Sequence, residues 1–284
     1  MRLSIFTLLL MASSSLLAQT NYAYQTFDDT RIVNGHSVET KQEGIMTFII
    51  SHRFGTINTG SYAVWGLDNA TMRMGLDYGI TNNLMIGIGR STFEKTADGY
   101  VKYRMLSQST GDKNMPVTVT LLGTTALKTL KRTDGIELTT EQKLSYTSQI
   151  LIARKFGEKL SLQLMPTYLH RNLVQDYEQN DIMSLGFAGQ YQFLKNWSFS
   201  LEYYATSSAD LPNETATNPG YNQSLAVGFQ IDTKGHIFQL HFGNSTGMIE
   251  KFFVAETQGK WGTGDIHFGF NITRDFKVKG RRVR

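Results

Sequence analysis

Residues 243–247 (Gly-Asn-Ser-Thr-Gly) match the G-x-S-x-G pattern that surrounds the nucleophilic serine of many hydrolases. Glu250, Asp265 and His267 follow Ser245 and could supply the acid and the histidine of a triad. That arrangement belongs to a parallel α/β sheet, which this chain's pattern does not predict. Asp265 and His267 also fall two residues apart on one predicted strand, so both would point the same way. We therefore expect a loop start at Ser245 and no catalytic residue.

A second group of polar side chains falls on the last two predicted strands. Gln239 and His241 share one face of the first, and Asp265, His267 and Asn271 share one face of the second. Histidine and carboxylate are good ligands, so a metal or polar-ligand site is one interpretation. The favoured interpretation is a hydrogen-bonded network that fills a narrow lumen, with no metal and no cofactor.

Charged side chains on the polar faces of other strands form a third candidate site. Cations come from the first half of the predicted sheet, and Glu202 and Asp265 come from the second half. Segregated charge of this kind would bias a pore toward anionic solutes. In the alternative, the cations pair with Asp77, Glu202 or Asp265 and block the lumen. The candidate lumen or ligand residues are Arg53, Arg73, Asp77, Lys102, Arg104, Glu202, Gln239, His241, Asp265, His267 and Asn271.

The elements that position these residues show strict alternation of apolar and polar residues. Within residues 182–193, for example, leucine and phenylalanine alternate with serine, glycine and glutamine. This period of two predicts strands with one apolar face. The pattern predicts about twelve strands, most near the ten residues that a tilted strand needs to cross a bilayer. Their ranges are 45–54, 71–80, 83–91, 98–106, 116–125, 142–154, 159–169, 182–193, 197–205, 223–232, 236–244 and 264–274.

The connections between these strands mostly alternate between long and short. Residues 126–141 and 206–222 are long, whereas 81–82 and 194–196 are very short; 92–97 and 107–115 are intermediate. Short periplasmic turns and long extracellular loops are typical of an outer-membrane barrel. A soluble β-sandwich or lipocalin-like barrel is the alternative, but its polar face would be rich in lysine and glutamate. Here that face carries mainly serine, threonine, glycine and amides. We predict a single antiparallel transmembrane β-barrel over residues 45–276.

Both ends of the chain carry further signals. Residues 1–18 combine Arg2, an apolar run and a terminal small residue, and predict a secretory signal peptide. Residues 19–44 are expected to be a periplasmic or lumen segment, with a disordered leader as the alternative. Residues 277–284 form a basic tail.

Composition excludes several classes of protein. The mean hydropathy of −0.25 argues against several membrane-spanning helices. The absence of cysteine excludes disulfides, thiolate metal sites and cysteine nucleophiles. The net charge of +4 shows no clustered basic run before the tail, so nucleic acid is not an expected partner.

Six stretches of the sequence carry a family resemblance: Arg31–Glu39, Ile50–Gly55, Asp77–Thr81, Gly87–Ser91, Leu151–Phe156 and Phe238–Met248. Together they resemble an uncharacterised outer-membrane β-barrel family of Gram-negative bacteria of the Bacteroidota type, catalogued as a domain of unknown function. The resemblance spans about residues 26–274 and implies the fold and the outer-membrane location. It implies no activity, so no residue receives a role from it.

Three functions compete at this point. The leading hypothesis is a monomeric barrel that acts as a narrow channel or solute-specific uptake porin with a positively charged lumen wall. The alternative is a non-conducting structural or interaction barrel whose loops bind a surface or periplasmic partner. An outer-membrane hydrolase comes third, and we expect no enzyme. The expected partners are the lipid bilayer and a small solute, whereas a protein partner is unknown.

Overall fold

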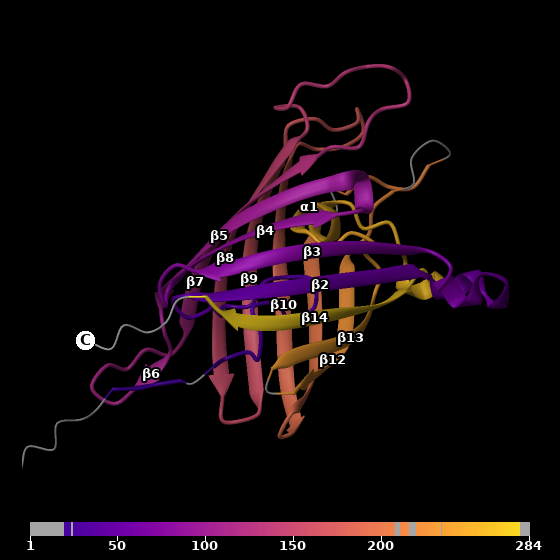
Figure 1. The fold of residues 1–284 in the computed structure, drawn as a ribbon. Coiled ribbons are helices and arrows are strands. Elements are labelled where there is room, and N and C mark those ends of the chain that lie inside the picture. Colours follow the sequence, from indigo (N-terminus) through magenta and orange to yellow (C-terminus); the bar gives the residue numbers. More distant parts are fainter. Residues whose placement is uncertain (1–19, 24, 208–210, 216–219, 234, 279–284) are drawn as a thin grey trace, which may run out of the picture.

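Twelve antiparallel strands close into one barrel, in which the last strand pairs with the first (Figure 1). The structure is a computed structural model and describes residues 20–23, 25–207, 211–215, 220–233 and 235–278. The predicted signal peptide and residues 279–284 of the tail lie outside the described residues. The barrel strands are β2 (Ile45–Thr56), β3 (Ala70–Gly79), β4 (Leu84–Ser91), β5 (Thr96–Leu106), β7 (Thr118–Lys128), β8 (Leu144–Phe156), β9 (Leu160–Arg171), β10 (Asp181–Leu194), β11 (Trp197–Thr206), β12 (Ser224–Asp232), β13 (His236–Gly243) and β14 (His267–Lys277).

The apolar face of each strand points outward, which confirms the predicted fold class. In β9 the leucines at 160, 162 and 164 are exposed, whereas Ser161 and Gln163 between them are buried. A soluble barrel would bury the apolar set, so the outward leucines identify a lipid-facing wall. The helices in the described part of the chain are α1 (Glu250–Ala255) and four 3-10 turns, and none is long and apolar enough to cross a membrane.

The two rims of the barrel differ in the length of their connections. The connections β3–β4, β8–β9, β10–β11 and β12–β13 are short and lie on one rim, which we take as the periplasmic one. The connections β2–β3, β7–β8, β9–β10, β11–β12 and β13–β14 are longer and lie on the other rim. One pair breaks this rule, because the 92–95 connection is short on the loop rim and the 107–117 connection is longer on the turn rim. The latter carries β6 (Ser109–Thr110), which pairs with β1 (Asn21–Tyr22) near the start of the described chain.

The predicted strands start and end within three residues of the observed ones. The largest functional consequence concerns Asp265, which was predicted to face inward from the last strand. That strand begins only at His267, because a 3-10 turn over Trp261–Thr263 and the left-handed Gly264 come before it. Asp265 instead lies in the loop and accepts hydrogen bonds from Asn58 and Thr263. The prediction for Asp265 was therefore wrong.

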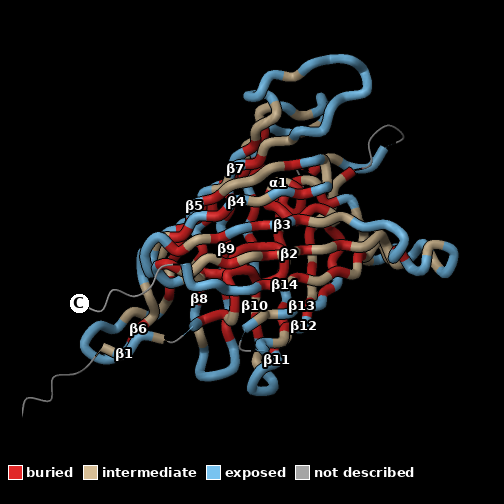
Figure 2. The backbone as a smooth tube through the Cα atoms, viewed as in Figure 1, coloured by how far each residue is buried: buried red, intermediate tan, exposed pale blue. Residues whose placement is uncertain are grey.

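The barrel interior contains two further pieces of the chain. One is the segment 25–41, called here the lumen segment, which precedes β2; the other is the loop 244–266 with its helix α1, called here the α1 loop. Buried residues lie along the barrel strands and in these two pieces, while the loops 57–69 and 129–143 are largely exposed (Figure 2). Phe27, Val33 and Phe253, from these two pieces, are no more than 1% exposed. The site is therefore built from the wall and from what the wall encloses.

Candidate functional site: a filled lumen

A tight turn forms the inner end of the lumen segment. Arg31 and His36 pair as an isolated antiparallel bridge, and the Ile32 N–H donates to the Gly35 carbonyl at 2.9 Å. Gly35 allows this turn to approach the wall closely. A Cβ at that position would lie 2.3 Å from the Tyr204 hydroxyl oxygen, far inside contact distance. Only glycine fits there without a shift.

Side chains of the wall satisfy the backbone groups of this turn. The buried Glu202 carboxylate on β11 accepts three hydrogen bonds, from the N–H groups of Val33, Asn34 and Gly35, at 3.3, 3.3 and 2.9 Å. Gln163 on β9 accepts from the Val38 N–H and donates to the His36 carbonyl, both at 2.8 Å. An irregular segment buried in a barrel needs such partners, because it has no ladder of its own.

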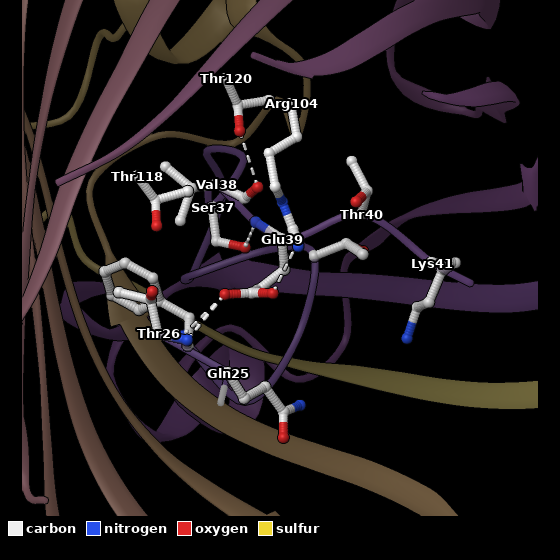
Figure 3. Close-up of polar contacts among 12 residues, drawn as sticks. Gln25, Thr26, Ser37, Val38, Glu39, Thr40, Lys41, Arg104, Thr118 and Thr120 are labelled. Carbon is white, nitrogen blue, oxygen red and sulfur yellow. Dashed lines mark hydrogen bonds and ion pairs between the residues drawn. The ribbon is translucent and has the colours of Figure 1, made fainter. Parts of the chain in front are cut away.

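Two cations on β5 hold the outer part of the lumen segment. The Lys102 ammonium donates to the carbonyls of Thr30, Ser37 and Glu39 at 3.1, 3.1 and 3.0 Å. Arg104 forms an ion pair with the Glu39 carboxylate at 2.9 Å (Figure 3). Both side chains come from one inward face, two residues apart, as the alternation in β5 dictates.

The predicted cluster near the barrel seam also contacts the lumen segment. Arg53 on β2 donates to the Asn34 side-chain oxygen at 2.6 Å. Asn271 on β14 donates to the Val33 carbonyl at 2.9 Å, and Gln239 on β13 donates to the Ile32 carbonyl. A cavity of about 10 Å³ lies beside these groups. That volume is about the minimum for one water molecule.

The α1 loop fills the lumen from the other rim. The Phe253 ring packs 5.1 Å from the ring of Tyr204, and the Phe252 ring meets Phe93 at 4.8 Å. Met248 and Ile249, just before the helix, are also buried. These contacts are mainly apolar, whereas the lumen segment combines buried apolar side chains with many hydrogen bonds to the wall.

The two pieces meet in the interior through a buried charged contact. The Glu250 carboxylate of α1 lies 3.9 Å from the Arg31 guanidinium and 3.6 Å from the His36 imidazole. Burial, with help from Arg31, lowers the pKa of His36 well below its ordinary value, so the ring is neutral at pH 7. Arg31 is therefore the cation that faces Glu250.

The remaining predicted residues lie elsewhere on the wall. Arg73 pairs with Asp98 of β5, and the Asp77 side chain lies buried over Gly87 beside the ring of Tyr100. His241 is buried against Gly269. The His267 Nδ1 lies 2.7 Å from the Phe54 carbonyl and its Nε2 lies 3.0 Å from the Thr246 hydroxyl.

Ser245 does not meet His267 in this arrangement. Its hydroxyl donates to the Gly247 carbonyl at 3.1 Å, while His267 contacts the neighbouring Thr246. A nucleophilic serine needs its base within hydrogen-bond reach. The G-x-S-x-G pattern here forms a buried turn into the α1 loop. Within the described residues, no group of three or more histidine, aspartate or glutamate side chains is placed to hold a metal ion.

Sequence reasoning missed several residues of this site. Glu39, Gln163, Glu250 and Asp98 were not among the candidate lumen residues, although each contacts a charged or backbone group inside the barrel. Glu250 was considered only as the acid of a triad. Gln163 could have been found from its place on the polar face of its strand. Glu39 and Glu250 could not, because neither lies in a strand and alternation says nothing about them.

A closed barrel with a lipid-facing apolar wall, short turns on one rim and long loops on the other defines the outer-membrane β-barrel class. The chain belongs to the family described as "Membrane bound beta barrel domain (DUF5777)", whose profile matches residues 27–276. That match confirms the predicted resemblance to an uncharacterised barrel family and supports the outer-membrane location.

A solved outer-membrane channel supports this fold. The COG4313 outer membrane channel from Pseudomonas putida F1 superimposes with a TM-score of 0.53 and 14% identity over 84% of this chain and 98% of that one. The NanC porin gives a TM-score of 0.48 at 11% identity, over 82% of this chain and 100% of that one. Similarity at this level concerns the fold alone. No curated protein sequence matches this chain.

Proposed function

We propose that this protein is an outer-membrane channel that is closed at rest, with the lumen segment as its plug and the α1 loop as its lid. The observation that carries the proposal is the set of hydrogen bonds that wall side chains make to the backbone of the lumen segment, beside the apolar packing of Phe27, Ile32, Val33 and Val38. Glu202, Lys102, Gln163, Gln239 and Asn271 all reach the segment through hydrogen bonds to its backbone.

Hydrogen bonds of this kind are compatible with a plug that moves out of the lumen. Water can replace each hydrogen bond when the segment moves out, so the wall would then line a hydrated path. The segment also buries Phe27, Ile32, Val33 and Val38 in one apolar cluster with wall residues. Exposing them to water costs free energy, which fits a channel that is closed at rest. In the proposed channel, the wall side chains that hold the lumen segment at rest become hydrated when the segment moves out.

Planar-bilayer recordings of the purified full-length protein test this function. We expect discrete openings above the detergent control, separated by long closed intervals because both rims are blocked at rest. A complete absence of openings across voltages and salt concentrations would contradict a channel.

That negative result would favour a second candidate, a non-conducting barrel whose loops bind a partner. The apolar packing of α1 against Tyr204 and Phe93 supports this candidate, since the helix forms a stable closure on the loop rim. Solute-specific uptake and the identity of any partner belong to these proposals.

A further inference from the structure

Lys102 and Arg104 differ from Arg73 in where their partners come from. The four oxygen atoms described above as their partners belong to the lumen segment: three carbonyls for Lys102 and the Glu39 carboxylate for Arg104. Arg73 instead pairs with Asp98 of the wall itself. If the lumen segment leaves, Arg73 keeps its partner, whereas Lys102 and Arg104 lose these four oxygens together.

Both oxygens of the Glu39 carboxylate accept hydrogen bonds. One oxygen accepts hydrogen bonds from the N–H groups of Thr26 and Phe27 at 2.8 and 3.3 Å, and the other accepts from Arg104 at 2.9 Å (Figure 3). Charge-assisted hydrogen bonds of this type are stronger than neutral ones and impose a geometry on the carboxylate. The wall therefore contributes a carboxylate-binding arginine with a buried ammonium two residues away.

Among the described residues, no wall carboxylate forms a hydrogen bond with Lys102 or Arg104. Glu202 lies on β11, across the closed barrel from β5, and is engaged there with the turn of the lumen segment. Two acids of the wall lie nearer. Asp98 on β5 itself is paired with Arg73, and Asp77 on β3 is buried over Gly87 and attracts Lys102 without a hydrogen bond to it. The carboxylate in direct contact with the pair is therefore the one that the lumen segment brings.

We propose that Lys102 and Arg104 form a binding site for a carboxylate-bearing solute, and that Glu39 occupies this site at rest as an internal substitute. The inference rests on the proposed function, because it names the solute class of the channel that the lumen segment closes. The site opens first toward the turn rim, where the side chains of Arg104 and Glu39 are 19% and 14% exposed. A solute carboxylate competes with Glu39 there and so favours release of the segment.

Calorimetric titration of citrate into the purified full-length protein in detergent tests the site directly. In E39Q the internal carboxylate is gone, so we expect citrate to bind about tenfold more tightly than to wild type, the factor expected for one charge-assisted hydrogen bond. In E39Q/R104Q that gain should disappear. The matched control is E39Q/K131Q, because Lys131 is an exposed cation in the 129–143 loop, and it should bind citrate like E39Q.

Equal citrate affinity in wild type and E39Q, or tight binding that survives R104Q, would overturn the proposal. Heat-modifiable migration in gel electrophoresis checks that each variant forms the barrel. Bilayer recordings of the same proteins distinguish the proposed channel function from the proposed carboxylate-binding site. Citrate binding without any channel openings would refute the channel and keep the site, whereas openings without citrate binding would refute the site alone.

Discussion

Gly35 is the position at which the backbone of the lumen segment approaches Tyr204 and Glu202 of the wall. Its backbone approaches Tyr204 so closely that an added Cβ would stand 2.3 Å from the hydroxyl oxygen and 3.2 Å from a Glu202 carboxylate oxygen. The same carboxylate oxygen accepts the hydrogen bonds of Val33 and Gly35. Any side chain here therefore disturbs both the packing and the hydrogen bonds of the turn.

We expect Gly35→Ala to loosen the lumen segment without unfolding the barrel. Amide hydrogen exchange at Val33–Gly35 should rise about tenfold, the result of weakening one hydrogen bond to a charged group. Tyr204→Phe removes the nearest atom and should restore part of the protection in the double variant. Gly123→Ala is the matched control, because a Cβ there meets nothing within 4 Å. Unchanged exchange in Gly35→Ala would show that the turn does not sit against Tyr204.

A small network of ion pairs links the α1 loop to the loop rim of the barrel. Lys251 bonds Glu94 at 3.1 Å and Glu256 at 2.9 Å, and Lys128 of β7 bonds Glu94 at 2.5 Å. Burial opposes ionisation of Glu94, but Lys251 and Lys128 outweigh it and lower the pKa of this carboxyl. The network therefore fastens the α1 loop most firmly where Glu94 is ionised.

This network predicts an acid-dependent loosening of the α1 loop. A carboxyl whose pKa is lower in the folded protein stabilises it above the ordinary value near 4.5 and loses that contribution as the pH falls through the folded pKa. A nitroxide label on a cysteine at the exposed position Gln258 should therefore become more mobile in electron paramagnetic resonance spectra as the pH falls below about 4.5. In Glu94→Gln the label should be mobile at neutral pH already, with a flatter pH profile. A pH profile identical to wild type would remove Glu94 from the closure.

The strands were predictable from the sequence, whereas the filling of the lumen was not. Alternation is a local pattern, so it located all twelve barrel strands and placed Arg53, Lys102 and Glu202 on the inward face. The partners of those residues are mostly backbone groups of a segment far away in the chain, and such contacts leave no periodicity. The wrong placement of Asp265 has a similar cause, because the turn before β14 interrupts the pattern that would have extended the strand.

The orientation of the whole molecule in the bilayer can be tested by two isoleucines of similar exposure. Ile88 lies on the outer face of β4 and is 64% exposed, and Ile136 lies in the 129–143 loop and is 59% exposed. A lysine on the lipid face near the bilayer midplane costs about 2–4 kcal/mol of folding free energy. We expect a cost of this size for Ile88→Lys and almost none for Ile136→Lys, measured by urea unfolding in lipid vesicles. Equal costs would contradict a lipid-facing wall at Ile88.

The central claim at the scale of the whole molecule is that the lumen segment closes the barrel and must move for conduction. The side chains of Asp28 in the lumen segment and Ser198 on β11 already meet, with the two oxygens 2.7 Å apart. The chain contains no cysteine, so a D28C/S198C pair would form the sole disulfide and would tie the segment to the wall.

Single-channel recording of D28C/S198C in its oxidised and reduced forms tests this claim most directly. The account predicts that the oxidised protein stays closed, that a reducing agent restores openings, and that wild type responds to neither treatment. Openings of unchanged size and frequency in the oxidised, fully cross-linked protein would contradict it.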